Sequence, residues 1–369
     1  MMKILHCVHA YVPHFGGCES VMSEMSERLV TRGHDVTVAT SFMEERKKKA
    51  INGVKVEEFK PDLSSEKQRY KTFVTKDDWD IIMVYHSKVW TSYWLYPLKG
   101  MKAPVLYFPV ELTDLGSMHP KYLSYYSMIE PKFLRNATRV GVLTSSDQKG
   151  YIPSKLKGRE EKIKLIPNGI DYNYFQKDPG VNIRKRWNIK EENLVYYVGG
   201  YFDKKQVDIL IKAVKGLDDF ALVTVGNDAG TYEQCKELAA GSSNIHLLGK
   251  INHKELVSAY HACDVYANAC NLEGFGVAVL EAMACGKPVV TLATGAFPDF
   301  FAKGTVGTLI DIDSASPDKF KEAFLQAVKS ENIEKAKRKN REVARQYDWE
   351  AIVDILENNY MEMIKVHEG

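Results

Sequence analysis

Two carboxylates, Glu273 and Glu281, stand eight residues apart around a glycine-flanked aromatic residue. The segment Gly-Phe-Gly at 274–276 leads into an apolar run over 277–284, and this pattern predicts a helix that begins at a glycine turn. The start of such a helix presents unpaired N–H groups and the positive end of the helix dipole, which together form a seat for phosphate. Because Glu281 falls within the helix and Glu273 before it, the two carboxylates can reach different parts of one elongated ligand.

The elements that must position this segment alternate between strand and helix. Gly286 and Pro288 end the helix, and Val289 begins a buried strand. Further strands are expected over 194–198, 220–225, 245–248, 265–267 and 307–310, with helices over 206–217, 254–261, 317–329 and 333–346. This alternation predicts an α/β layer with a parallel sheet, in which ligands collect beyond the carboxyl ends of the strands.

The first half of the chain shows the same alternation. Strands are expected over 3–8, 36–40, 54–59, 80–85, 105–108 and 140–144, and helices over 20–32 and 122–136. Gly16 and Gly17 lie at the first turn from strand to helix, and a Pro-Asn-Gly turn at 167–169 marks the passage between the halves. A last helix is expected from Trp349 to Ile364. The chain is therefore predicted to form two doubly wound α/β domains.

Length and charge agree with about two domains, each able to bury its own core. Up to Asp171 there are 26 Lys+Arg against 20 Asp+Glu, a surplus of +6, and the remainder has 24 against 28, or −4. A basic first half could attract anionic lipid or a phosphorylated acceptor, although a solvated surface rich in lysine explains the surplus equally well. No apolar run reaches the length of a bilayer span, and the start of the chain does not fit a signal peptide.

The cysteines show no metal-binding or disulfide spacing. Neither Cys-x-x-Cys nor Cys/His ligand spacing occurs, which predicts reduced thiols, no metal site and a cytoplasmic protein. The six are Cys7, Cys18, Cys235, Cys263, Cys270 and Cys285. Asp311-Ile312-Asp313 has the letters of a metal-binding Asp-x-Asp, but it follows a late strand and is interpreted as a surface turn.

Three motifs resemble the retaining glycosyltransferases of family 4, also called glycosyl transferases group 1. They are EGFG-x3-LEAMA-x-GKPVV from Glu273, P-x-x-GG-x-E with L-x-x-RGH-x-V over 13–36, and IPNGID over 166–171. The resemblance covers nearly the whole chain. It implies the GT-B fold, with two Rossmann-like domains facing across a cleft and a C-terminal helix crossing back to the N-terminal domain. The implied boundaries are 1–167 for an acceptor-binding domain, 168–346 for a nucleotide-sugar-binding domain and 347–369 for the returning helix.

The resemblance also implies roles for particular residues. Glu273 contacts the donor sugar, Glu281 holds the ribose of the nucleotide, and Lys205 meets the diphosphate, so that Glu273 and Lys205 are the expected catalytic residues. Charge on the diphosphate is then met by cationic side chains and backbone N–H groups, with no metal or other cofactor. The remaining expected donor-binding residues are Gly16, Gly17, Gly274, Phe275, Gly276 and Val277.

Some positions depart from the family pattern. Gly200 stands where the family has an arginine, with Lys204 as a substitute cation. Pro109 stands where the family has a histidine after the strand 105–108, with Glu111 the nearest ionisable residue and His119 too far along to match. Ala269-Cys270 replaces a Pro-Ser pair.

The favoured function is a hexosyltransferase of polysaccharide or glycoconjugate synthesis. It would move a hexose from a nucleotide-diphosphate sugar to a glycan or lipid-linked acceptor, without nucleic acid as a partner. An alternative is a GT-B protein that binds nucleotide-sugar without transferring it. A dinucleotide-dependent oxidoreductase is disfavoured, because Gly16-Gly17 is not a G-x-G-x-x-G and Thr40-Ser41 lacks the ribose-binding acid.

Two segments bear on a membrane or acceptor surface. The charged run at 44–49 is interpreted as a solvated loop, and the aromatic segment at 89–96 as core packing. Peripheral contact with the inner membrane face is the alternative for both.

Overall fold

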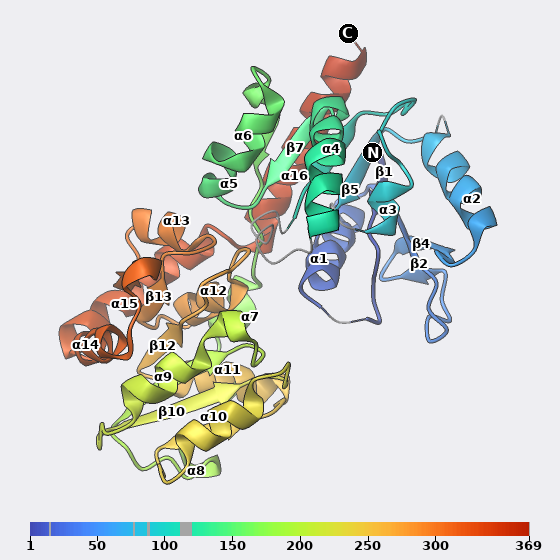
Figure 1. Ribbon diagram of the computed structural model, residues 1–369. Coiled ribbons are helices and arrows are strands. Elements are labelled where there is room, and N and C mark those ends of the chain that lie inside the picture. The colour runs from blue at the N-terminus through green and yellow to red at the C-terminus, as the bar shows by residue number, and fades with distance from the viewer. Residues whose placement is uncertain (15, 77, 87–88, 111–119, 369) are drawn as a thin grey trace. The chain divides into compact units, whose positions relative to one another are not determined.

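The chain forms two compact units, which are described one at a time (Figure 1). The computed structural model describes residues 1–14, 16–76, 78–86, 89–110 and 120–368, with side chains except those of residues 120–127, 151 and 368. The first unit comprises Met1–Asn168 and Trp349–Gly369, and the second comprises Gly169–Asp348.

The first unit is organised around a sheet of eight strands within the described residues, in the order β3-β4-β2-β1-β5-β6-β7-β8. Neighbouring strands are parallel except β3 and β4. In the centre, Ile4 lies opposite both Val36 and Ile81. The strands are β1 (Lys3–Cys7), β2 (Asp35–Ser41), β3 (Ala50–Ile51), β4 (Val54–Phe59), β5 (Ile81–Tyr85), β6 (Val105–Phe108), β7 (Arg139–Val142) and β8 (Ile163–Leu165).

The helices of the first unit include the last helix of the chain. They are α1 (Gly17–Thr31), α2 (Ser64–Thr75), α3 (Trp90–Tyr93), α4 (Pro120–Asn136), α5 (Ser145–Lys149), α6 (Tyr151–Leu156) and α16 (Trp349–Glu368). Helix α16, red in Figure 1, packs against α1 and β5, as expected of a helix that returns to the N-terminal half.

A buried histidine links α16 to the centre of the sheet. His6 of β1 contacts the Ser26 hydroxyl through Nδ1 at 2.8 Å and the Tyr360 hydroxyl through Nε2 at 2.9 Å. Burial lowers the pKa of His6 to about 3, so the ring is neutral. At the surface, Arg32 pairs with three carboxylates of α16, those of Glu350, Asp354 and Glu357. The last helix is therefore held by both a buried polar contact and ion pairs.

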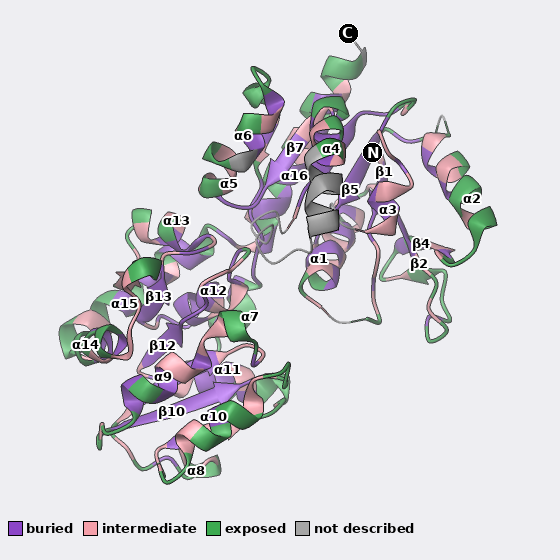
Figure 2. Cartoon of the chain, in the orientation of Figure 1, coloured by how far each residue is buried: buried purple, intermediate pink, exposed green. Residues whose placement is uncertain are grey.

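The second unit has a six-stranded parallel sheet within the described residues, in the order β11-β10-β9-β12-β13-β14. Its strands are β9 (Asn193–Val198), β10 (Phe220–Val225), β11 (Ile245–Leu248), β12 (Val265–Asn268), β13 (Val289–Leu292) and β14 (Gly307–Ile310). Its helices are α7 (Tyr172–Phe175), α8 (Ile183–Arg186), α9 (Val207–Val214), α10 (Tyr232–Ala239), α11 (His253–Ala262), α12 (Val277–Ala284), α13 (Phe297–Ala302), α14 (Pro317–Ala327) and α15 (Ser330–Arg345). Figure 2 shows β10 buried while α10 and α14 keep exposed outer faces, and the edge strands β11 and β14 include half-buried residues.

The structure confirms the predicted α/β class with two parallel sheets. It also confirms that the aromatic segment packs into the core, since Trp90 and Trp94 lie against Tyr70. The interpretation of 44–49 as a solvated loop is wrong for Arg46, whose side chain is buried. Arg46 pairs with Glu58 and donates to the backbone carbonyls of residues 11 and 12, because the loop after β1 needs partners for those groups.

Candidate functional site

The glycine turn before α12 leaves the start of that helix without a side-chain cap from the described residues. Gly276 is the N-cap and has φ +95°, a conformation that favours glycine. A Cβ atom there would also clash with the ring of Phe297. No acidic residue occupies the first turn of the helix within this described segment. The Val279 N–H donates to the Gly276 carbonyl at 3.0 Å. The N–H groups before it form the end of the helix that can bind an anion.

Phe275 and Gly274 differ in what they can offer a ligand. The Phe275 ring is buried against Phe300 and Tyr347, at centroid distances of 5.6 and 6.2 Å. Only the main chain of Phe275 can therefore serve a ligand. Gly274 is exposed, and a Cβ atom there would meet nothing within 4 Å.

Lys205 and Glu273 form an ion pair before α12. Lys205 ends a 3₁₀ turn that follows β9, and its Nζ lies 2.6 Å from Glu273 Oε2. Both side chains are 17% exposed. Burial acts to lower the pKa of Lys205, but Glu273 and Cys270 outweigh it, and the net shift is upward. Lys205 is therefore a cation held in a partly buried site.

Backbone contacts fix the two segments that carry this pair. The Asn271 N–H donates to the Lys204 carbonyl at 3.0 Å, which joins the segments directly. The Glu273 N–H donates to the Thr294 hydroxyl at 3.1 Å. Lys204 itself is exposed, so of these two lysines only Lys205 is built into the site.

Glu281 lies five residues beyond Gly276, about 7 Å along the helix at 1.5 Å per residue. Its Oε2 accepts a hydrogen bond of 2.7 Å from the Tyr260 hydroxyl of α11. Burial raises the pKa of the Glu281 carboxyl to about 7, and the Tyr260 bond opposes part of that shift. The residue keeps some exposed surface, so a ligand can still reach it.

The other glycine turn, at Gly16 and Gly17, belongs to the first unit. Gly16 is the N-cap of α1, and the buried carboxylate of Glu19 lies against it, so that a Cβ atom on Gly16 would clash with Glu19. His14 Nδ1 lies 3.3 Å from Glu19 Oε1, and His9 Nε2 lies 3.9 Å from the same oxygen. The structure thus brings Lys205, Glu273 and residues 274–281 together within one unit, while Gly16 and Gly17 stand in the other.

Of the positions that depart from the family pattern, Gly200 has a local explanation. A Cβ atom on Gly200 would lie 2.6 Å from the Phe202 ring, so a larger side chain would have to displace that ring. Pro109 is buried directly after β6. Glu111 and His119 lie outside the described residues.

Other features of the described residues concern metal binding, membrane spans and thiols. Residues 311–313 are exposed and lead into a 3₁₀ turn, as interpreted from sequence. No cluster of three His, Cys, Asp or Glu side chains in the described part is arranged to hold a metal ion. None of its helices is long and apolar enough to cross a membrane. Five cysteines are buried, namely Cys7, Cys235, Cys263, Cys270 and Cys285.

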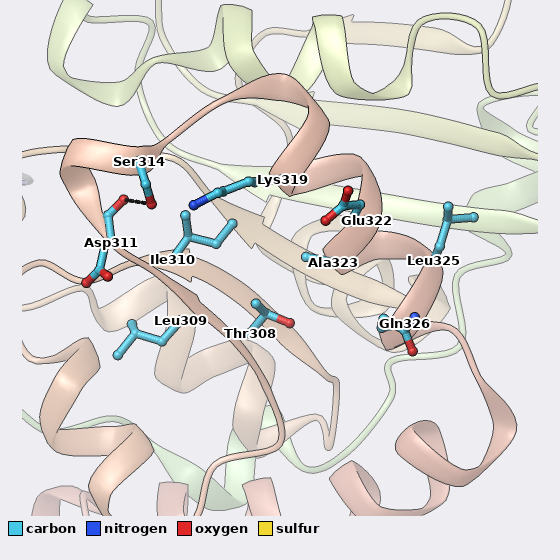
Figure 3. Close-up of a pocket in the computed structure, with 10 residues that line it drawn as sticks. All are labelled: Thr308, Leu309, Ile310, Asp311, Ser314, Lys319, Glu322, Ala323, Leu325 and Gln326. Atoms are coloured by element: carbon cyan, nitrogen blue, oxygen red, sulfur yellow. Dashed lines mark hydrogen bonds between the residues drawn. The ribbon is translucent and has the colours of Figure 1, made fainter.

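One cavity of about 520 Å³ lies beside the edge strand β14 (Figure 3). Lys319 and Glu322 of α14 line it together with Asp311. None of the residues expected to bind the donor lines this cavity. It is therefore separate from the candidate site.

Sequence reasoning missed the residues that support the two carboxylates. Tyr260 bonds Glu281 and Thr294 bonds the main chain of Glu273, yet each lies 21 residues from its partner in sequence. Tyr260 lies in the helix predicted over 254–261, whereas Thr294 lies in the turn after the strand that begins at Val289. Only the packing of these elements shows which side chains meet.

Two family descriptions match the chain. "Glycosyltransferase Family 4" matches residues 15–174, and "Glycosyl transferases group 1" matches residues 181–347. Together they cover most of both units, in agreement with the family expected from the three motifs.

Curated proteins named as glycosyltransferases are also similar to this chain. An uncharacterized glycosyltransferase of Methanocaldococcus jannaschii, MJ1178, is 29% identical over 208 residues, covering 54% of this chain and 58% of the relative. The lipopolysaccharide glucosyltransferase WaaG of Escherichia coli is 24% identical over 331 residues, covering 84% of this chain and 85% of the relative. The match thus spans little more than half of the first relative and most of the second.

A solved structure confirms the predicted fold. HepE of Anabaena, in complex with UDP and glucose, superposes with a TM-score of 0.79 over 98% of this chain and all of that chain, at 19% identity. At this identity the likeness bears on the fold alone.

Proposed function

Because the chain belongs to the group 1, or family 4, glycosyltransferases, we propose that it transfers a hexose from a nucleotide-diphosphate sugar to a glycan or lipid-linked acceptor. The observation that carries the proposal is the Lys205–Glu273 ion pair beside the uncapped start of α12, with Glu281 on the same helix. One elongated donor has a sugar, a diphosphate and a ribose, and this set of groups offers a partner for each.

The diphosphate is assigned to Lys205 and to the backbone N–H groups of Phe275, Gly276 and Val277. Negative charge grows on the diphosphate as its bond to carbon one of the sugar breaks. A lysine and fixed N–H groups stabilise that charge in a site with little water. Lys205 has three N–H donors, so it can keep Glu273 while it meets a phosphate oxygen.

Glu273 and Glu281 are assigned to the two sugars of the donor. Glu273 accepts hydrogen bonds from the hydroxyl groups of the hexose, and Lys205 fixes the Glu273 side chain before the donor arrives. Glu281 accepts from the ribose hydroxyls. The main chain of Gly274 is open to the donor because nothing crowds it.

The first unit is proposed to bind the acceptor, and Gly16 and Gly17 to approach the donor phosphates. The boundaries proposed for these roles are residues 1–167 and 168–346, with 347–369 as the returning helix. The basic surplus before Asp171 is consistent with an anionic or lipid-linked acceptor at the inner membrane face.

The test is a panel of radiolabelled nucleotide-sugars that differ in base and hexose, each assayed for transfer and for hydrolysis. The UDP and glucose named with the Anabaena structure make UDP-glucose the first to try. Turnover above that of a Lys205→Ala control supports the proposal. Binding without turnover of any donor would instead support the non-catalytic alternative, to which Gly200 and Pro109 point.

A second arm repeats the active combination in EDTA. Because Lys205 and backbone N–H groups are assigned to the diphosphate, activity and nucleotide affinity should survive chelation. A strong loss that magnesium or manganese restores would contradict the metal-independent part of the proposal.

A further inference from the structure

The carboxylate assigned to the ribose is held by a residue that no motif includes. The Tyr260 hydroxyl of α11 donates to Glu281 Oε2 of α12 at 2.7 Å. A glutamate side chain on a helix has three rotatable bonds, and a single short hydrogen bond from a fixed donor selects among its conformers. How well this hydrogen bond orients the Glu281 side chain therefore depends on how firmly Tyr260 is fixed.

Tyr260 is fully buried within a cluster of aromatic rings. Its ring lies 5.1 Å from Tyr196 of β9, 5.6 Å from Tyr266 of β12 and 6.0 Å from Phe175 of α7. Rings from three other elements thus pack against it. The hydroxyl is consequently a rigid donor rather than a mobile one.

Among the described residues, the groups that interact with the Glu281 carboxylate are phenols and a thiol. Arg341 of α15 instead donates to the Cys285 carbonyl at 3.3 Å. The nearby hydroxyl of Tyr266 is directed to the Val198 carbonyl at 3.4 Å. The titratable groups that interact with the carboxylate are Tyr196, Tyr260, Tyr266 and Cys285.

We infer that Tyr260 is a positioning residue that orients Glu281 for binding the donor ribose. The inference rests on the proposed function, in which Glu281 meets the ribose. With Tyr260 on Oε2, the other carboxylate oxygen and the remaining lone pair of Oε2 can accept from the two ribose hydroxyls. A protonated carboxyl loses part of that accepting capacity, because one oxygen then carries a hydrogen.

The pKa of Glu281 makes the role measurable. Burial raises this pKa to about 7, and the Tyr260 hydrogen bond acts to lower it. In the wild type, affinity for a ribonucleotide should therefore rise as the pH increases through about 7. Loss of the Tyr260 hydroxyl should move that rise to higher pH, because the ionised form loses its main hydrogen bond.

The experiment compares Tyr260→Phe with wild type by calorimetry between about pH 5.5 and 8.5, a window that brackets the Glu281 pKa. The probes are UDP, GDP and ADP and their 2′,3′-dideoxy counterparts. Each dideoxy compound carries the same diphosphate, so titration of the phosphate cancels in the comparison. Tyr266→Phe is the matched control, since it removes a buried hydroxyl from the same cluster that is bonded to the Val198 carbonyl, and leaves the Tyr260 hydrogen bond to Glu281 in place.

Tyr260→Phe should weaken the best ribonucleotide about tenfold at pH 7, leave its dideoxy counterpart within about twofold, and shift the pH dependence upward. Equal weakening of both probes, an unshifted pH dependence or the same result from Tyr266→Phe would overturn the inference. If no nucleotide binds the wild type at all, the proposed function itself fails.

A second variant, Glu281→Gln, provides a test if Tyr260→Phe folds poorly. Glu281→Gln cannot ionise, so it should flatten the difference in pH dependence between ribonucleotide and dideoxynucleotide. If the affinity of that variant for the ribonucleotide still rose with pH relative to its affinity for the dideoxynucleotide, the inference would be contradicted without any measurement on Tyr260→Phe.

Discussion

A glycine turn precedes helix α1 and another precedes helix α12, and the two helix N-termini differ in the charged groups that lie near them. Neither helix has a side-chain cap hydrogen bond among the described residues. At α1 the buried carboxylate of Glu19, in the first turn, lies against Gly16 and is approached by His14. At α12 the first turn carries no acidic residue, and Lys205 pairs with Glu273 in the segment before it. A glycine turn before a helix is therefore an anion seat only where the chain does not already fill it.

This difference has a consequence for the donor. A phosphate that approached Gly16 would meet the negative charge of Glu19, whereas one that approached α12 would meet uncapped N–H groups and Lys205. We therefore expect the second unit to supply most of the diphosphate affinity. Gly16 and Gly17 remain proposed contacts whose contribution is smaller.

Replacing Lys205 should have the largest effect. Lys205→Ala should cost binding of a nucleoside diphosphate about 2–5 kcal/mol, because the diphosphate loses its main cation and Glu273 is left unpaired. Affinity for the nucleoside alone should hardly change, since Lys205 is assigned only to phosphate. Calorimetry with both compounds measures the difference.

Lys204→Ala is the control for this change, because Lys204 is exposed. If Lys205→Ala weakened nucleoside and diphosphate equally, Lys205 would be a structural residue. An effect of Lys204→Ala as large as that of Lys205→Ala would move the phosphate contact to Lys204.

Glu281→Ala should come next, with nucleotide affinity lower by roughly ten- to a hundredfold. The expected loss is that of a charge-assisted hydrogen bond to the ribose, about 1.5–3 kcal/mol. Circular dichroism should show an intact fold. Unchanged affinity for every nucleoside diphosphate would remove Glu281 from the site.

The contrast between the turns can also be tested through stability. Gly16→Ala places a methyl group where Glu19 lies and should lower the free energy of unfolding by about 1–3 kcal/mol. Gly274→Ala meets nothing within 4 Å and should change that free energy by less than about 0.5 kcal/mol. Urea unfolding of both variants measures the two values, and equal destabilisation would contradict the contrast.

The smallest predicted effect on nucleotide binding has the opposite sign. Glu273→Gln should strengthen binding of a nucleoside diphosphate by on the order of 1 kcal/mol, because Lys205 no longer shares its charge with a carboxylate. Transfer of the hexose should nevertheless fall, since the assigned sugar contact is altered. A weaker diphosphate affinity in this variant would mean that Glu273 mainly holds Lys205 in place.

Much of the fold follows from local patterns in the sequence. The strands at 54–59, 105–108, 220–225, 245–248 and 307–310 and the helix at 277–284 occur with the expected bounds. Except for 54–59, which includes three charged residues, these segments are mostly apolar runs between turn residues, so burial and local propensity agree. Helices α2 and α10 were not predicted, because their mostly exposed residues give a weak apolar stripe.

The sequence by itself also determined the family and the chemical types at the candidate site, since the glutamates and glycines of one motif stand within nine residues of each other. The tertiary structure decided which hydrogen bonds and ion pairs these residues form. Glu19 fills the start of α1, Tyr260 bonds Glu281, and Lys205 pairs with Glu273 across 68 residues of chain. The physical reason is that capping, burial and ion pairing depend on which side chains meet in space, and separation along the chain does not fix those distances.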